Sequence, residues 1–469
     1  MTDSQSSEAL QEKPNIYVLF DIPDISGNTV RFSWTSSHLS DLFRKGKDFV
    51  EFEYHQKVEL NPMIAYNQLY AIFFPILHSA IHGNIDVGFA EALPRDQIQL
   101  WKNIRDSDSV NIVSEMIDNN FGLQEVSNES QDGGIALLYG GGKDSLGALS
   151  LYSRMYPTEE INLLRIHWSR QSISRHRKIF NESVIDPLKE KIKLNYLECS
   201  STLHINLKDR KTAHHVGINF HHACCLPYYA DNRFRIVNYS YDALEFFTSP
   251  TKGYPSIRPE KANQMTNILR KLEIPTSIRN ISFGIPSFSH FDIILSDERD
   301  LIPLTYMCED TNERWCYNCR KCFTFGLLCL EAQLSSANSG IDYVRLFSST
   351  EYFGGKVLPI LELQNDKYSS ILAYEHQFSS FRHLLSNVKP NQLVKNNILS
   401  QNDASKLISL VELYALEIPV TRTVWSRAIQ FEDPDYFSKT LEQIQQIGIS
   451  IFDGSHLTLN NKNLSEYQF

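Results

Sequence analysis

The sequence predicts an α/β protein built on a doubly wound parallel sheet. Short apolar runs, which have the length of buried strands, alternate with longer segments of helical periodicity. One of these runs leads directly into a glycine triplet and then into a helical pattern, the order of strand, loop and helix. Apolar residues make up 42% of the 469-residue chain and charged residues 21%, so the chain can fill a complete core.

The first of these runs, residues 135–139, is apolar throughout, as expected of a strand that is buried on both faces. Helical segments separate these runs, and a helical crossover joins parallel neighbours. We expect strands at residues 135–139, 162–167, 194–198 and 235–238, and helices after the glycine triplet and over residues 175–191 and 219–229.

Shifts in composition divide the chain into four parts. A polar lead, residues 1–14, is expected to be disordered, and residues 15–130 form an α+β N-terminal addition. A small polar, glycine-ended stretch, Ser127 to Gly134, separates that addition from the α/β domain, residues 131–340. Residues 341–469 contain little glycine and are expected to be a mainly helical C-terminal domain.

Charge and hydropathy exclude several classes of protein. The chain has 45 basic and 55 acidic residues, a net charge of −10, which argues against general nucleic-acid binding. No apolar run reaches the roughly 18 residues of a membrane span. The polar N-terminus lacks the apolar core of a secretory signal, so we expect a cytoplasmic protein without a membrane partner.

The glycine triplet opens a candidate phosphate loop. Glycines let the backbone turn tightly and bring its N–H groups against an anion, and the following helix adds its positive end. The spacing is neither that of a Walker A loop nor that of the dinucleotide fingerprint. The alternative is an ordinary turn after a buried strand, with the aspartate as a helix cap. The loop consists of Gly140, Gly141, Gly142, Lys143, Asp144 and Ser145.

Four of the eight cysteines lie within fifteen residues of one another. Cys308, Cys316, Cys319 and Cys322 give the spacing C-x7-C-x2-C-x2-C, and a C-x2-C step brings two thiolates to one tetrahedral ion. We expect a structural zinc site. An iron–sulfur cluster and unliganded buried thiols are the alternatives. The other four cysteines are expected in the core.

The phosphate loop resembles the PP-loop of the N-type ATP pyrophosphatases, in which a serine stands at the position of Gly140. Together with the cysteine spacing and the segment Gly253-Tyr254-Pro255-Ser256-Ile257-Arg258-Pro259-Glu260, it resembles the 7-cyano-7-deazaguanine synthase (QueC-like) family. The resemblance covers roughly residues 133 to 336 and implies the fold of the adenine nucleotide alpha hydrolase-like (PP-loop) proteins.

The resemblance implies an ATP-dependent ligase. ATP and Mg²⁺ would adenylate a 7-carboxy-7-deazaguanine-type carboxylate, and an amine would then attack to give an amide or a nitrile. The implied catalytic residues are Lys143, Asp144, Ser145 and Arg258. The implied contacts to the substrate are Tyr254, Arg258 and Glu260, although Arg258 paired with Glu260 is an alternative.

The additions on both sides of the α/β domain suggest a bulkier acceptor than ammonia. This pattern resembles the QueC-like proteins of bacterial anti-phage systems, the Qat system and type IV CBASS. That resemblance implies conjugation of the deazaguanine to a partner protein of the same operon. Two alternatives stay open: a tRNA-modifying PP-loop enzyme, and a degenerate nucleotide-binding scaffold without turnover.

Overall fold

The computed structural model describes most of the chain between residues 16 and 463. The described residues are 16–81, 84–103, 110–117, 133–167, 173–209, 212, 218–240, 259–282, 284–307, 313–317, 319–348, 379–415, 424–425, 434–452, 458–459 and 462–463.

The chain divides into two compact units. The first comprises residues 1–124 together with 199–231, and the second comprises residues 125–198 together with 232–469. The sequence did not predict that residues 199–231 belong to the first unit. The domain limits expected from the sequence stay predictions.

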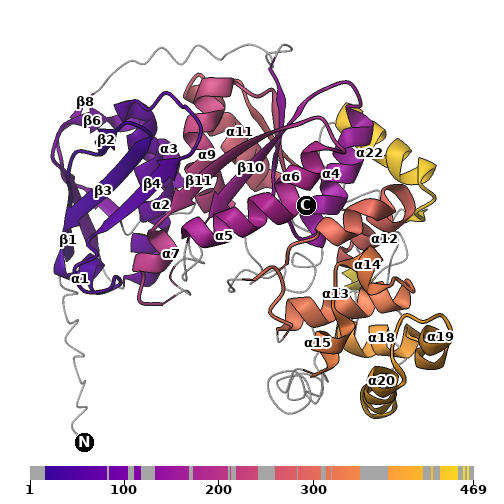
Figure 1. Ribbon diagram of the computed structural model, residues 1–469. Helices are drawn as coiled ribbons and strands as arrows, with labels where there is room; N and C mark the ends of the chain where they lie inside the picture. The colour runs from indigo at the N-terminus through magenta and orange to yellow at the C-terminus, as the bar shows by residue number, and fades with distance from the viewer. Residues whose placement is uncertain are drawn as a thin grey trace, which may run out of the picture. The chain divides into compact units, whose positions relative to one another are not determined.

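The first unit combines a mixed sheet with a buried helix (Figure 1). Strand β1 is parallel to β5, which is parallel to β7, whereas β1, β3 and β4 are antiparallel neighbours. Residues 199–201 pair with β4. The elements are β1 (Ile16–Phe20), β2 (Asp24–Ser26), β3 (Thr29–Thr35), α1 (Ser37–Ser40), β4 (Phe49–Tyr54), α2 (Pro62–Ala80), β5 (Ile85–Phe89), β6 (Leu93–Pro94), α3 (Arg95–Asn103), β7 (Val110–Ile112), β8 (Met116–Ile117), α7 (Leu203–Asn206) and α9 (Ile218–Asn232).

Helix α2 forms the centre of the first unit. Asn61 caps its start by accepting a hydrogen bond from the amide of Ile64 at 2.9 Å, and Pro62 occupies the first turn, where it needs no partner. Residues 64–77 are all buried, because the helix is covered on every side rather than along one stripe. None of the helices in the described ranges has the length and apolar character needed to cross a membrane.

The second unit is α/β with helices around a parallel sheet (Figure 1). Its elements are β9 (Ile135–Leu138), α4 (Lys143–Met155), β10 (Ile161–His167), α5 (Ile173–Phe180), a π-helical turn (Asn181–Ile185), α6 (Asp186–Lys189), β11 (Leu194–Ser201, of which 194–198 belong here), β12 (Ile236–Tyr239), α11 (Pro259–Lys271), β13 (Ser277–Asn280), α12 (Ser287–Asp297), a 3₁₀ helix (Arg299–Leu304), α13 (Arg320–Glu331), α14 (Ser336–Ser339), α15 (Tyr343–Ser348), α18 (Ser379–Asn387), α19 (Pro390–Lys395), α20 (Gln401–Tyr414), β14 (Val424–Trp425), α22 (Pro434–Gln446), β15 (Ile451–Phe452), β16 (Thr458–Leu459) and β17 (Lys462–Asn463).

The strand order confirms the predicted α/β class with a mostly parallel sheet. In this unit the order is β13-β12-β9-β10-β11, and the pairs β9–β10, β9–β12 and β12–β13 are parallel. The first strand of this unit, β9, lies in the middle of the sheet, and β10 and β11 follow on one side of it. The chain then returns, and β12 and β13 lie on the other side of β9. The carboxyl ends of β9 and β12 therefore form a topological switch point, where open α/β sheets bind ligands.

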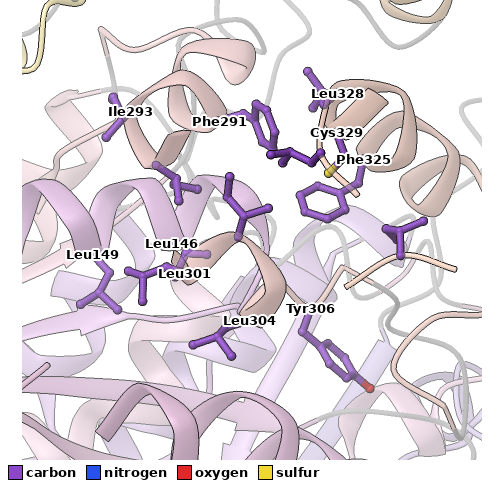
Figure 2. Packing of buried hydrophobic residues seen from close by; sticks show 14 of the residues in the cluster. Leu146, Leu149, Phe291, Ile293, Leu301, Leu304, Tyr306, Phe325, Leu328 and Cys329 are labelled. Carbon is purple, nitrogen blue, oxygen red and sulfur yellow. The ribbon is translucent and has the colours of Figure 1, made fainter. Parts of the chain in front are cut away.

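Helices α4 and α12 pack against each other beside this sheet. Gly147 allows the close approach, since a Cβ there would lie 2.8 Å from the carbonyl oxygen of His290. Asp297 joins the helices further along, accepting hydrogen bonds from Ser150 Oγ at 2.6 Å and from Arg154 Nε at 2.5 Å. Figure 2 shows the apolar cluster to which α4, α12, the 3₁₀ helix and α13 contribute Leu146, Leu149, Phe291, Leu301, Phe325 and Leu328.

Candidate phosphate loop and cysteine cluster

The glycine triplet lies at the carboxyl end of β9, the central strand of the second unit. All four residues of β9 are buried, and helix α4 begins directly after the triplet at Lys143. Gly142 is the residue that precedes the helix; its backbone is extended, and no side chain caps the helix there. The first amides of α4 therefore lie at the switch point, and no capping side chain at position 142 accepts a hydrogen bond from them.

The protein holds the carbonyl group of each glycine in the triplet. Because a trans peptide directs its N–H away from its C=O, anchored carbonyls orient the next amides in the opposite direction. Among the described residues, the amides of Gly141 and Gly142 have no acceptor. The anchoring contacts run from Arg165 Nη1 to Gly140, from the amide of Tyr306 to Gly141 at 2.6 Å, and from Ser145 Oγ to Gly142 at 3.0 Å.

Gly141 needs to be glycine. Its φ of +79° lies in the left-handed region, which other residues rarely adopt. A Cβ at this position would also lie 2.5 Å from Cε2 of Phe180 and 3.3 Å from Cβ of Tyr306. A left-handed residue within a turn directs successive amides to one concave side, the arrangement that binds anions.

Lys143 and Asp144 form an ion pair at the start of α4. Lys143 Nζ lies 2.5 Å from Asp144 Oδ1, and the lysine side chain is buried whereas the aspartate is partly exposed. Burial alone would raise the pKa of Asp144, but the charge of Lys143 and its hydrogen bond outweigh burial and lower that pKa. The carboxylate is therefore ionised at neutral pH and can take part in binding a cation.

His290 belongs to the surroundings of the loop, although sequence reasoning did not single it out. It is fully buried on α12, and burial lowers its pKa to about 4, with opposing contributions from Asp144 and Lys143. Neither ring nitrogen has a hydrogen-bond partner in the described part of the chain. A neutral imidazole therefore lies within electrostatic reach of the Lys143–Asp144 pair.

A second polar cluster lies at the carboxyl end of β10, beside the middle of β11. His167 Nε2 lies 3.0 Å from Glu198 Oε2, and Arg177 is paired with the other carboxylate oxygen. Burial lowers the pKa of His167 to about 4; the pKa of Glu198 falls to about 2 because the hydrogen bonds from His167 and Arg177 outweigh its burial. The signal available in the sequence was a charged residue within each of two predicted strands, Arg165 in residues 162–167 and Glu198 in residues 194–198.

Three of the four predicted metal ligands are brought together. Cys322 Sγ lies 3.7 Å from Cys316 Sγ and 3.5 Å from Cys319 Sγ, and the three sulfur atoms lie within 4.8 Å of one another. Tetrahedral ligands bound at about 2.3 Å lie about 3.8 Å apart, so the cluster could hold a metal ion such as zinc. Cys308 lies outside the described residues. The remaining cysteines, Cys199, Cys224, Cys225 and Cys329, are buried as expected.

The segment that leads into the cysteine cluster also contacts the glycine loop. Tyr306, two residues before Cys308, donates its amide to the carbonyl of Gly141. Arg314, two residues before Cys316, donates to the carbonyl of Thr305 at 2.9 Å from Nη2. The same stretch of chain therefore supports both the loop and the cluster.

The predicted substrate-contacting residues cannot be placed. Tyr254 and Arg258 lie outside the described residues, and Glu260 is described only as part of the backbone of α11. Their assigned roles, and the alternative pairing of Arg258 with Glu260, stay predictions.

Comparison with known proteins identifies no relative. No protein-family model matches the chain, and no match was found among the curated proteins or the solved structures.

Proposed function

We propose that this chain is an ATP-dependent ligase of the QueC-like, PP-loop type. It adenylates a 7-carboxy-7-deazaguanine-type carboxylate and joins the acyl group to an amine. The observation that carries the proposal is the glycine loop at the switch point, where all three glycine carbonyls are held and the amides of Gly141 and Gly142 have no acceptor among the described residues.

The first step is transfer of AMP to the carboxylate. A carboxylate oxygen attacks the α-phosphorus of ATP, the bond to the bridging oxygen breaks, and pyrophosphate leaves with the electron pair. The amides of residues 141–143 and the positive end of α4 stabilise the departing charge. Mg²⁺, when bound, neutralises part of the phosphate charge, and Asp144 is the carboxylate of the loop that would hold it.

The second step releases AMP. The amine attacks the acyl carbon of the adenylate, the bond to the phosphate oxygen breaks, and a proton leaves the nitrogen. With ammonia the product is a primary amide, and a second activation removes its oxygen to form the nitrile. With a protein amine the product is a conjugate. A closed site protects the adenylate from water in either case.

We assign a structural role to the cysteine cluster. Three sulfur atoms that lie within 4.8 Å of one another fit a single tetrahedral zinc ion better than an iron–sulfur cluster, in which at least two of the three thiolates bind different iron atoms. Cys316, Cys319 and Cys322 would bind zinc together with Cys308. The segment that contains these cysteines has little core of its own, and zinc would hold it in place against the glycine loop.

The acceptor we propose is a partner protein of an anti-phage operon. The support is the bulk on both sides of the α/β domain, which a ligase that uses ammonia does not need. The net charge of −10 disfavours the tRNA-modifying alternative.

Intact mass spectrometry tests the proposal. The full-length chain and any co-purifying protein are incubated with ATP, Mg²⁺ and 7-carboxy-7-deazaguanine, and pyrophosphate is measured in parallel. Lys143→Met should abolish pyrophosphate release. Lys178→Met is the matched control, because the side chain of that lysine is 73% exposed and forms a surface ion pair with Glu182.

The outcomes separate the alternatives. A mass gain matching amide-linked deazaguanine on a protein supports conjugation, and free nitrile with no adduct identifies a small-molecule synthase. Pyrophosphate released without dependence on deazaguanine points to another substrate, such as tRNA. If no pyrophosphate is released under any of these conditions, the ligase assignment is wrong and the scaffold alternative holds.

A further inference from the structure

Arg165 is a buried cation at the base of the glycine loop. It lies on β10, between the buried residues Leu164 and Ile166, and is 8% exposed. Its guanidinium donates through Nη1 to the carbonyl of Gly140 and stacks over the ring of Phe180, with Cζ 4.2 Å from the ring centroid. Nε is buried and has no acceptor among the described residues.

No acidic side chain in the described ranges forms an ion pair with Arg165. Glu198, on the neighbouring strand, is paired with Arg177. The other cation of the loop, Lys143, is paired with Asp144. Carbonyl oxygens and the face of Phe180 are therefore the groups seen to stabilise the charge of Arg165.

Burying a charge is unfavourable unless an opposite charge or a full set of hydrogen bonds compensates it. An anion that binds close to such an arginine compensates the buried charge, and this compensation strengthens the binding of the anion. The loop whose carbonyl Arg165 holds is the place where the described structure leaves amides without acceptors. The amides without acceptors, and a buried cation that has no acidic partner among the described residues, therefore point to one anionic ligand.

We propose that Arg165 is a positioning residue of the phosphate site, and that it fixes the backbone that receives the pyrophosphate group of the proposed reaction. This inference rests on the proposed function and deepens it. Arg165 holds the Gly140 carbonyl, which directs the following amide toward the phosphate, and its charge offsets the charge of the ligand through the loop. It also supplies the fixed positive charge that Lys143, neutralised by Asp144, does not supply alone.

Arg235 provides a matched control at the opposite end of β9. It likewise donates to a glycine carbonyl, Gly133, with Nη1 at 3.0 Å, and its guanidinium lies 5.4 Å from the ring centroid of Tyr156. It differs in one respect, because its Nη2 is paired with Glu159 at 2.5 Å. Loss of Arg235 removes a charge that is paired with Glu159, whereas loss of Arg165 removes a charge that has no acidic partner in the described part of the chain.

The experiment measures binding of inorganic pyrophosphate, with and without Mg²⁺, to the full-length chain by titration calorimetry, together with its Tm. Arg165→Met should weaken pyrophosphate binding by about 10- to 100-fold, the effect of losing a charge-assisted contact. Arg165→Lys keeps the charge without the planar stack and should lose about 3- to 10-fold. Arg235→Met should bind pyrophosphate as the unaltered chain does.

Stability separates a positioning role from a merely structural one. Without ligand, Arg165→Met should melt at the same temperature as the unaltered chain or higher, whereas Arg235→Met should melt lower because Glu159 loses its partner. Acetate, a singly charged anion, should bind equally weakly to the unaltered chain and to Arg165→Met.

Three results would overturn the inference. If Arg165→Met binds pyrophosphate normally, or if it loses affinity only as much as Arg235→Met does, Arg165 has no special role. If Arg165→Met melts lower and keeps its affinity, the arginine is structural. If the unaltered chain binds neither pyrophosphate nor ATP, the proposed function is wrong as well. If the unaltered chain binds pyrophosphate and only the predictions for the Arg165 variants fail, the inference on Arg165 is wrong and the proposed function is not affected.

Discussion

Alanine at each glycine of the triplet should produce different effects on stability. Gly141→Ala places a side chain at a φ of +79°, which costs about 1–2 kcal/mol. The new Cβ also lies 2.5 Å from Cε2 of Phe180, and overpacking of this kind costs about 1–3 kcal/mol. We expect Gly141→Ala to lose about 2–5 kcal/mol in the free energy of unfolding of the second unit.

Gly142→Ala should separate binding from folding. Gly142 has an extended backbone, and the nearest atom to an added Cβ is Met307 Cγ at 3.9 Å, so the methyl group fits. Because alanine is a poorer residue than glycine before a helix, the loss of stability should stay within about 1 kcal/mol. A methyl group nevertheless keeps a phosphate from the backbone, so pyrophosphate affinity should fall by about tenfold or more.

Urea unfolding followed by circular dichroism measures the free energy of unfolding, and calorimetric titration with pyrophosphate measures the affinity. Gly140→Ala is the control for stability, since its added Cβ lies 3.8 Å from both Arg165 Nη1 and Ser145 Oγ. A Gly141→Ala protein as stable as the unaltered chain would refute the backbone geometry. A Gly142→Ala protein with undiminished affinity would refute the role of the amides.

Three further predictions concern pH, helix packing and the metal. Stability should fall as the pH drops from about 6.5 to about 2. The folded pKa values of His167 (about 4) and Glu198 (about 2) lie below their ordinary values, so the unfolded chain takes up protons first. In urea titrations at a series of pH values, Glu198→Gln should remove the part of this dependence that lies at the lower pH. Asp297→Asn should cost about 1–3 kcal/mol by weakening the clamp between α4 and α12, whereas Asp300→Asn, at a 70% exposed side chain, should change unfolding by less than about 0.5 kcal/mol. Chelation or Cys319→Ser should lower both Tm and pyrophosphate affinity. Bound pyrophosphate should in return raise the affinity for zinc, measured in competition with a chromogenic chelator; equal zinc affinity with and without pyrophosphate would refute the coupling.

Local signals in the sequence predicted the centre of the second unit. The apolar run at 135–139, the triplet and the periodic segment after it correspond to β9, the loop and α4, because strand, turn and helix follow from neighbouring residues. The C-x2-C steps likewise predicted the sulfur cluster. Local patterns are the part of a fold that needs no knowledge of distant contacts.

Contacts between distant residues could not be predicted in this way. Arg165 contacts the loop from β10, and Tyr306 contacts it from a segment far along the chain. His290 packs against α4, because Gly147 lets two helices approach. The grouping of residues 199–231 with the first unit also depends on a pairing with β4 that no local pattern encodes. The buried charge of Arg165 in a strand was the one local sign of such a contact.

Isotope exchange between pyrophosphate and ATP tests the central claim most directly. The full-length chain is incubated with ATP, Mg²⁺ and labelled pyrophosphate, with or without 7-carboxy-7-deazaguanine and without any amine. Reversible adenylation on the glycine loop predicts label in ATP only when the carboxylate is present, and none with Lys143→Met. Absence of exchange in a chain that binds both ATP and the carboxylate, or exchange that ignores the carboxylate, would contradict it.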